Sequence, residues 1–132
     1  MAQRPLSPHL SVYRMTRYTL ATSIFNRFTG LGLSLGLLLL VYWLLAVAGG
    51  ALAQARAERF LGHPLMKIVY AALIVSFCYH LVAGIRHLVW DTGRGLERAQ
   101  SQKSAWVVVL VSAALVLAIC WWILAAAWSA AP

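Results

Sequence analysis

Charged residues are scarce in this sequence, and acidic ones are nearly absent. Of its 132 residues only 11% are charged, with eleven Lys and Arg against three Asp and Glu. A soluble globular domain has roughly 25% charged residues, so this shortage excludes water as the main solvent of the chain. The two cysteines, Cys78 and Cys120, form no CxxC or CxxCH motif, which argues against structural zinc and against covalently attached c-type haem.

Long apolar runs take the place of the missing charges. Hydrophobic residues make up 62% of the chain, and the mean hydropathy is +0.78. Three apolar runs are each long enough to cross a hydrocarbon core, which needs about 20 helical residues. The predicted fold class is all-α, a transmembrane three-helix bundle that forms a single domain over residues 1–132. The expected parts are a cytoplasmic arm at 1–21 and three transmembrane helices at 22–50, 64–91 and 104–128. Residues 51–63 are expected to form a loop that can contain a helical turn in Ala51–Phe60.

The net charge of +8 predicts an orientation in the membrane rather than a nucleic-acid partner. Basic residues gather in the short connections, as the positive-inside rule requires, and no basic patch with interleaved aromatics lies outside the spans. One side carries three of them and the other side carries seven: Arg56, Arg59 and Lys67 against Arg4, Arg14, Arg17, Arg27, Arg94, Arg98 and Lys103. We expect a cytoplasmic N-terminus and a periplasmic C-terminus. Without a recognisable signal peptide, a bacterial cytoplasmic (inner) membrane is the simplest location.

The second span carries the ionisable residues that point to chemistry. Such side chains are costly in lipid and are functional candidates by default. His80 is the deepest, and His80, Gly84, His87 and Asp91 fall along one helical face. A neutral imidazole can ligate iron, and a glycine one turn away leaves room for a porphyrin. The pattern predicts a haem b site with His80 as one axial ligand and a partner chain as the source of the other.

Each of these residues also has a purely structural interpretation. His80 can be hydrogen-bonded across helices without any iron, and His87 is as readily a polar residue at the membrane interface as a contact of the haem propionates. Arg86 lies off the His80 face and is expected to meet lipid headgroups or a partner subunit. Either a second helix or a flat cofactor could approach the small residues of the first span, which are Gly30, Gly32, Ser34 and Gly36.

A second candidate cluster opens the first span. The helix is expected to begin near Thr22 or Ser23, either of which can cap it. Ser23 and Arg27 are four residues apart and share a face. Their hydroxyl and cation could bind a quinone carbonyl or a haem propionate, although an arginine at a helix start is ordinarily a topology determinant.

Three segments together resemble one known family. They are the arm RPLSPHLSVY at residues 4–13, the S-x-x-x-R-x-T-G pattern from Ser23, and the H-x-x-x-G-I-R-H-L-x-W-D pattern from His80. In order and spacing the chain is similar to the cytochrome b556 family of succinate dehydrogenase, the larger of the two membrane-anchor polypeptides of that complex. The resemblance covers nearly the whole chain.

The resemblance implies a non-catalytic subunit of succinate dehydrogenase (respiratory complex II). In that family a flavoprotein oxidises succinate, and an iron–sulfur protein relays electrons to ubiquinone or menaquinone at its junction with two anchor subunits. By position, His80 takes the haem-ligand role, shared with a histidine of the smaller anchor, and His87 lies near the haem. Ser23 and Arg27 match quinone-site residues, Arg27 also lying close to the propionates. Many relatives have histidine where this chain has Asn26, whose amide cannot carry charge or a titrating proton.

Two alternative functions stay open at this point. The same architecture could serve a quinol:fumarate reductase, which runs electrons in the opposite direction. It could also be a haem-free structural anchor in which His80 only bonds a neighbouring helix. A small transporter subunit is disfavoured, because no proton-carrying acid lies within a span.

Overall fold

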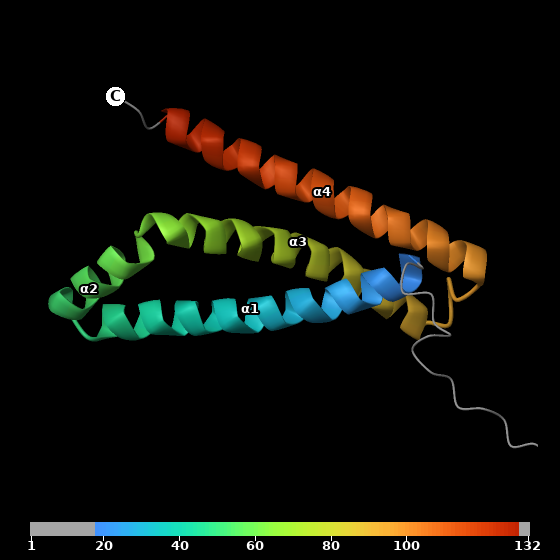
Figure 1. Ribbon diagram of the computed structural model, residues 1–132, viewed down its shortest axis with the longest axis horizontal. Coiled ribbons are helices and arrows are strands. Elements are labelled where there is room, and N and C mark those ends of the chain that lie inside the picture. The colour runs from blue at the N-terminus through green and yellow to red at the C-terminus, as the bar shows by residue number, and fades with distance from the viewer. Residues whose placement is uncertain (1–17, 130–132) are drawn as a thin grey trace, which may run out of the picture.

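Three long helices and one short helix make up the computed structural model, which describes residues 18–129 (Figure 1). In chain order they are α1 (Tyr18–Ala48), α2 (Ala51–Leu61), α3 (Pro64–Asp91) and α4 (Arg98–Ser129). By length and composition α1, α3 and α4 can each cross a membrane. The predicted all-α fold class with three transmembrane helices is confirmed.

Two of the helices begin earlier than the sequence predicted. Because α1 begins at Tyr18, Thr22 and Ser23 lie inside the helix and do not cap it. Similarly, α4 begins at Arg98, six residues before the expected start at 104. Neither extension contains glycine or proline, so nothing in them interrupts the helical backbone. The rest of the predicted arm, residues 1–17, lies outside the described residues.

The helical turn expected in Ala51–Phe60 is a complete short helix, because α2 fills most of the connection at 51–63. Gly50 makes the turn from α1 with a positive φ of 87°, a backbone conformation that glycine adopts without steric cost. The segment that follows consists mainly of good helix formers. A bond from the Tyr70 hydroxyl to the Leu61 carbonyl oxygen (2.8 Å) then ties the end of α2 to α3.

All three long helices come together at one end of the molecule. Figure 1 shows α1 and α3 running side by side, with α4 beside α3 near the start of α1 and separating from it towards the C-terminus. The buried cluster consists of Tyr79, Ala83 and Val108. Farther along α4, Leu117 and Trp128 are 70% and 87% exposed. Such extensive apolar surface on a single chain is suited to contact with lipid or with other membrane chains.

Arg86 joins the three long helices where they meet. Its side chain is only 8% exposed. From α3, Nε donates to Ser104 Oγ (2.9 Å), Nη1 to Thr22 Oγ1 (3.1 Å) and Nη2 to the Ser101 carbonyl oxygen (2.8 Å). The guanidinium also lies 4.0 Å from the centroid of the Trp90 ring. The expectation that Arg86 meets lipid headgroups or a partner was therefore wrong, because hydroxyls and a carbonyl of α1 and α4 accept its hydrogen bonds inside the chain.

We predict that Arg86→Leu destabilises the folded protein by about 3 kcal/mol, because hydrogen bonds to a charged group contribute roughly 1.5–3 kcal/mol each and their partners would be left unpaired. Arg86→Lys should have an intermediate effect, since an ammonium keeps the charge but lacks the planar fork that reaches three acceptors. Thermal unfolding in mild detergent measures both. Arg94→Leu, at an exposed position of the α3–α4 connection, is the control. Wild-type stability of Arg86→Leu would contradict the assigned role.

Candidate functional site

The imidazole of His80 lies against the backbone of α1. Its Nδ1 is 3.1 Å from the carbonyl oxygen of Asn26 and 3.4 Å from Thr29 Oγ1. A Cβ atom at Gly30 would come within 3.0 Å of the ring's Cε1, so the missing side chain at this position makes room for the imidazole. These α1 residues flank Arg27 in the sequence. The structure thus brings the deep histidine of the second span to the cluster that opens the first.

The contact with Asn26 fixes which ring nitrogen of His80 carries the proton. A carbonyl oxygen can only accept a hydrogen bond, so Nδ1 must be the donor. Nε2 then holds a lone pair, and no side chain or backbone group among residues 18–129 donates a hydrogen bond to it. Metal-ligating histidines have this arrangement, with one nitrogen hydrogen-bonded to a carbonyl or carboxylate and the other free for the metal.

The glycines of α1 differ from Gly84 of α3 in what surrounds them. In α1, a Cβ atom at Gly36 would collide with the Leu73 side chain of α3, and one at Gly30 would press on His80. These glycines of the first span therefore allow close packing of two helices. Gly84 in α3 is different, because a Cβ atom there would meet nothing within 4 Å. Its surface is open to a molecule from outside the chain.

The remaining predicted site residues are more accessible to such a molecule. Ser23 is half-buried and Arg27 is exposed. Neither side chain forms a hydrogen bond or ion pair within the described part of the chain. His87 is half-buried, and its ring packs edge-on against Trp90 with centroids 5.2 Å apart. Asp91 is exposed at the end of α3. Across residues 18–129 there is no group of three His, Cys, Asp or Glu side chains that could hold a metal ion.

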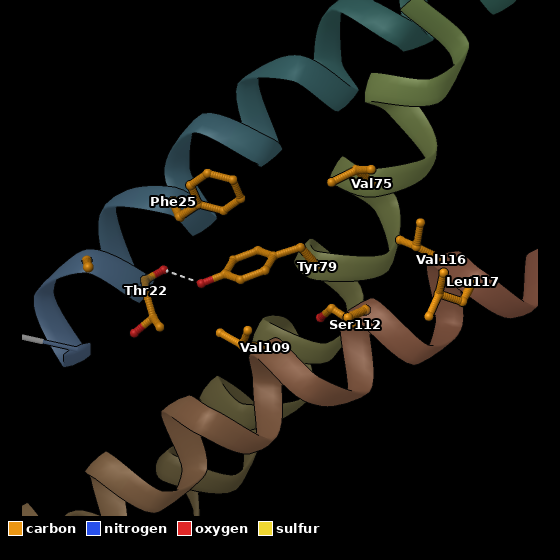
Figure 2. Close-up of a pocket in the computed structure, with 10 residues that line it drawn as sticks. Thr22, Phe25, Val75, Tyr79, Val109, Ser112, Val116 and Leu117 are labelled. Atoms are coloured by element: carbon orange, nitrogen blue, oxygen red, sulfur yellow. Dashed lines mark hydrogen bonds between the residues drawn. The ribbon is translucent and has the colours of Figure 1, made fainter. Parts of the chain in front are cut away.

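An apolar pocket of about 610 Å³ lies between α1, α3 and α4 (Figure 2). Tyr79 projects from α3 towards α1, where its hydroxyl donates to the Thr22 carbonyl oxygen at 2.9 Å. That hydroxyl is therefore already engaged within the chain. Ser23 and Arg27 do not line this pocket. The predicted quinone residues and the pocket accordingly belong to different sides of α1.

Sequence reasoning missed the polar contacts that hold α1 against α3. Thr29 had no assigned role, yet its side chain is 4% exposed and reaches His80. Tyr79 was also unassigned and Thr22 was considered only as a helix cap, yet the two residues join the same two helices. A usable signal was present, since a hydroxyl inside an apolar span must find a hydrogen-bond partner there. What the sequence does not give is which helix supplies that partner.

Comparison with known proteins gives a consistent result along nearly the full chain. The family described as succinate dehydrogenase/fumarate reductase transmembrane subunit matches residues 1–119. The chain is 40% identical over 116 residues to the succinate dehydrogenase cytochrome b556 subunit of Paracoccus denitrificans, a match that covers 88% of this chain and 87% of that protein. The resemblance inferred from the sequence motifs is confirmed.

Further relatives come from other bacteria and from mitochondria. The cytochrome b556 subunit of Rickettsia prowazekii is 34% identical over 115 residues, covering 87% of this chain and 89% of the relative. The mitochondrial succinate dehydrogenase cytochrome b560 subunit of Bos taurus is 40% identical over 110 residues, covering 82% of this chain and 64% of the relative.

We predict that two glycine substitutions near His80 differ in effect. Gly30→Ala should destabilise the protein by about 1–3 kcal/mol, because the new methyl group presses on the His80 ring in a packed interface. In Gly84→Ala the new methyl group meets no atom within 4 Å among the described residues, and this variant serves as the matched control. Alanine gains up to about 1 kcal/mol of helix propensity over glycine. Thermal unfolding of the chain in detergent compares them, and equal destabilisation would contradict the assignment of Gly30 to the His80 contact.

Proposed function

The chain belongs to the succinate dehydrogenase/fumarate reductase transmembrane-subunit family and is the cytochrome b membrane-anchor subunit of succinate dehydrogenase (respiratory complex II), and on this premise we propose that it binds haem b through His80 and helps to form the quinone-reduction site with Ser23 and Arg27. The chain itself is not catalytic. Succinate is oxidised in another subunit, and electrons reach the quinone by way of iron–sulfur clusters. The observation that carries this proposal is the hydrogen bond from His80 Nδ1 to Asn26 (3.1 Å).

The residues around His80 fit a haem b group. With the proton on Nδ1, Nε2 would hold the iron, and the absence of a side chain at Gly84 leaves open space one helical turn away. When bound, haem b supplies a one-electron carrier. His87 lies two turns from His80 towards the end of α3, and we assign it, with Arg27, to the propionates. His80 would hold the iron from α3, and a second membrane-anchor subunit would supply the remaining protein ligand.

Arg27 and Ser23 supply the donors for the quinone, which is ubiquinone or menaquinone. The exposed guanidinium of Arg27 makes no bond within the described residues, so its donors are available to a substrate oxygen. Ser23 adds a hydroxyl one turn earlier on the same face. A fixed cation orients the quinone and stabilises the negative charge that develops on its oxygens during reduction.

The protein is a multi-pass membrane subunit of the succinate dehydrogenase complex. We propose a bacterial inner membrane with the N-terminus in the cytoplasm and the C-terminus in the periplasm, since the basic residues are concentrated on the N-terminal side. The partners are then the second anchor subunit, the iron–sulfur subunit, the flavoprotein and the lipid membrane. In this orientation Arg27 faces the side on which the iron–sulfur subunit docks and from which protons are drawn.

A haem-free anchor would use the same contact between His80 and Asn26 for packing alone. Gly84 favours haem over that alternative. Glycine in a helix interior costs about 1 kcal/mol relative to alanine, and no described residue of this chain occupies the space that its missing side chain leaves. A ligand that stacks there gives the glycine a purpose.

We expect His80→Ala to abolish the b-type α band in the reduced-minus-oxidised spectrum of the purified complex, because the substitution removes an iron ligand. His63→Ala is the matched control. His63 lies at the opposite end of α3, where its Nδ1 accepts a bond from the Leu65 amide (3.3 Å), so its loss should affect helix capping and leave the band in place. An unchanged spectrum in His80→Ala would falsify the ligand assignment and support the haem-free anchor.

Arg27→Ala should lower quinone reductase activity by about 100-fold, the size of effect seen when one donor to a developing oxyanion is removed. Succinate oxidation with a soluble dye acceptor should persist, because the flavoprotein does not depend on this residue. Arg94→Ala is the control, because Arg94 is exposed and follows the C-terminal end of α3. Equal loss of quinone and dye activities in Arg27→Ala would mean that the residue serves assembly instead.

A further inference from the structure

Thr29 lies between two carbonyl groups of its own helix and the imidazole of His80. Its Oγ1 is 3.0 Å from the Phe25 carbonyl oxygen and 3.0 Å from that of Asn26. A buried hydroxyl inside an apolar span must donate its proton, and these two carbonyls are the acceptors that it reaches within its own helix. The hydroxyl therefore keeps a lone pair for His80 Nδ1, which lies 3.4 Å away.

The three groups form a closed hydrogen-bonded arrangement. His80 Nδ1 donates to the Asn26 carbonyl oxygen at 3.1 Å and towards Thr29 Oγ1 at the longer distance. The one proton of the Thr29 hydroxyl is shared between this carbonyl and that of Phe25, each 3.0 Å from Oγ1. The Asn26 carbonyl oxygen thus lies within hydrogen-bond distance of both the Thr29 hydroxyl and the His80 ring.

We infer that Thr29 is a positioning residue for the haem ligand, because it holds the Asn26 carbonyl and the His80 ring in the geometry that keeps the proton on Nδ1 and the lone pair on Nε2. This inference rests on the proposed ligand role of His80. Hydrogen bonding at Nδ1 makes the imidazole a stronger electron donor, and a stronger donor favours ferric over ferrous iron. Thr29 therefore lowers the midpoint potential of the haem.

The test is a potentiometric titration of the b-type haem in the assembled complex carrying Thr29→Val. Valine keeps the side-chain shape and removes the hydroxyl. We expect the haem to be retained and the ferric/ferrous equilibrium to shift towards ferrous by about three- to tenfold. This is at or below the roughly 10- to 100-fold effect on metal affinity or activity of losing a residue that hydrogen-bonds a metal ligand. For a one-electron couple this is a rise of about 30–60 mV. Thr29→Ser restores the hydroxyl and should return the potential to the wild-type value.

Ser34→Ala is the matched control on the same helix. Ser34 Oγ donates to the Gly30 carbonyl oxygen at 3.0 Å, which is the same bond to the preceding turn. Its side chain is exposed, and its hydroxyl forms no hydrogen bond with His80. Removal of its hydroxyl should therefore leave the haem potential unchanged.

The possible outcomes separate this inference from the ligand assignment. An unchanged potential in Thr29→Val, or an equal shift in Thr29→Val and Ser34→Ala, overturns the role of Thr29. If the valine variant does not assemble, Thr29→Ala provides the same comparison. Should His80→Ala keep its haem spectrum, the ligand proposal fails whatever Thr29 does. If His80→Ala loses the haem and Thr29→Val leaves the midpoint potential unchanged, His80 remains the ligand and only the positioning role of Thr29 is rejected.

Discussion

The hydrogen bonds of one buried guanidinium hold the three long helices together. In a membrane the apolar faces of helices gain little from leaving lipid, so small residues and polar contacts decide how helices associate. Here Arg86 reaches Thr22 of α1 and Ser101 and Ser104 of α4. Because these groups lie at one end of the bundle, α4 is fixed there, and it separates from α3 towards its C-terminus (Figure 1).

The same end of the bundle contains the proposed site, and the two features depend on one another. Thr22 accepts bonds from Arg86 and from the Tyr79 hydroxyl, which sets the position of the first turns of α1 against α3. The next turn of α1 then brings the Asn26 carbonyl to His80. On this side the Tyr79 hydroxyl and the His80 ring of α3 find acceptors on α1, while Arg27 and the surface of Gly84 remain open. The contacts between α1 and α3 therefore leave the proposed binding surface accessible to molecules outside the chain.

Much of this could be predicted from the sequence, since length and hydropathy alone determine three spans in 132 residues. His80 was identifiable as a candidate site residue, because an imidazole so far inside an apolar run is costly without a function. Helix packing was not predictable in the same way. The helical angle correctly separated Arg86 from the face of His80, yet it could not tell whether lipid, a partner or α4 lay beyond. That depends on how α4 is placed in space, and the hydroxyls of Ser101 and Ser104 carry no sign of it in the sequence.

Position 26 illustrates the difference between a backbone and a side-chain contribution. The family resemblance implies a histidine at this position, where this chain has Asn26 and therefore no titratable group next to Arg27. The bond to His80 comes from the main-chain carbonyl, which any residue supplies at that position. The amide oxygen of Asn26 is itself buried without a donor among the described residues, so the side chain is not what stabilises the contact. The substitution therefore alters the charge available beside Arg27 and leaves the proton on His80 Nδ1 in place.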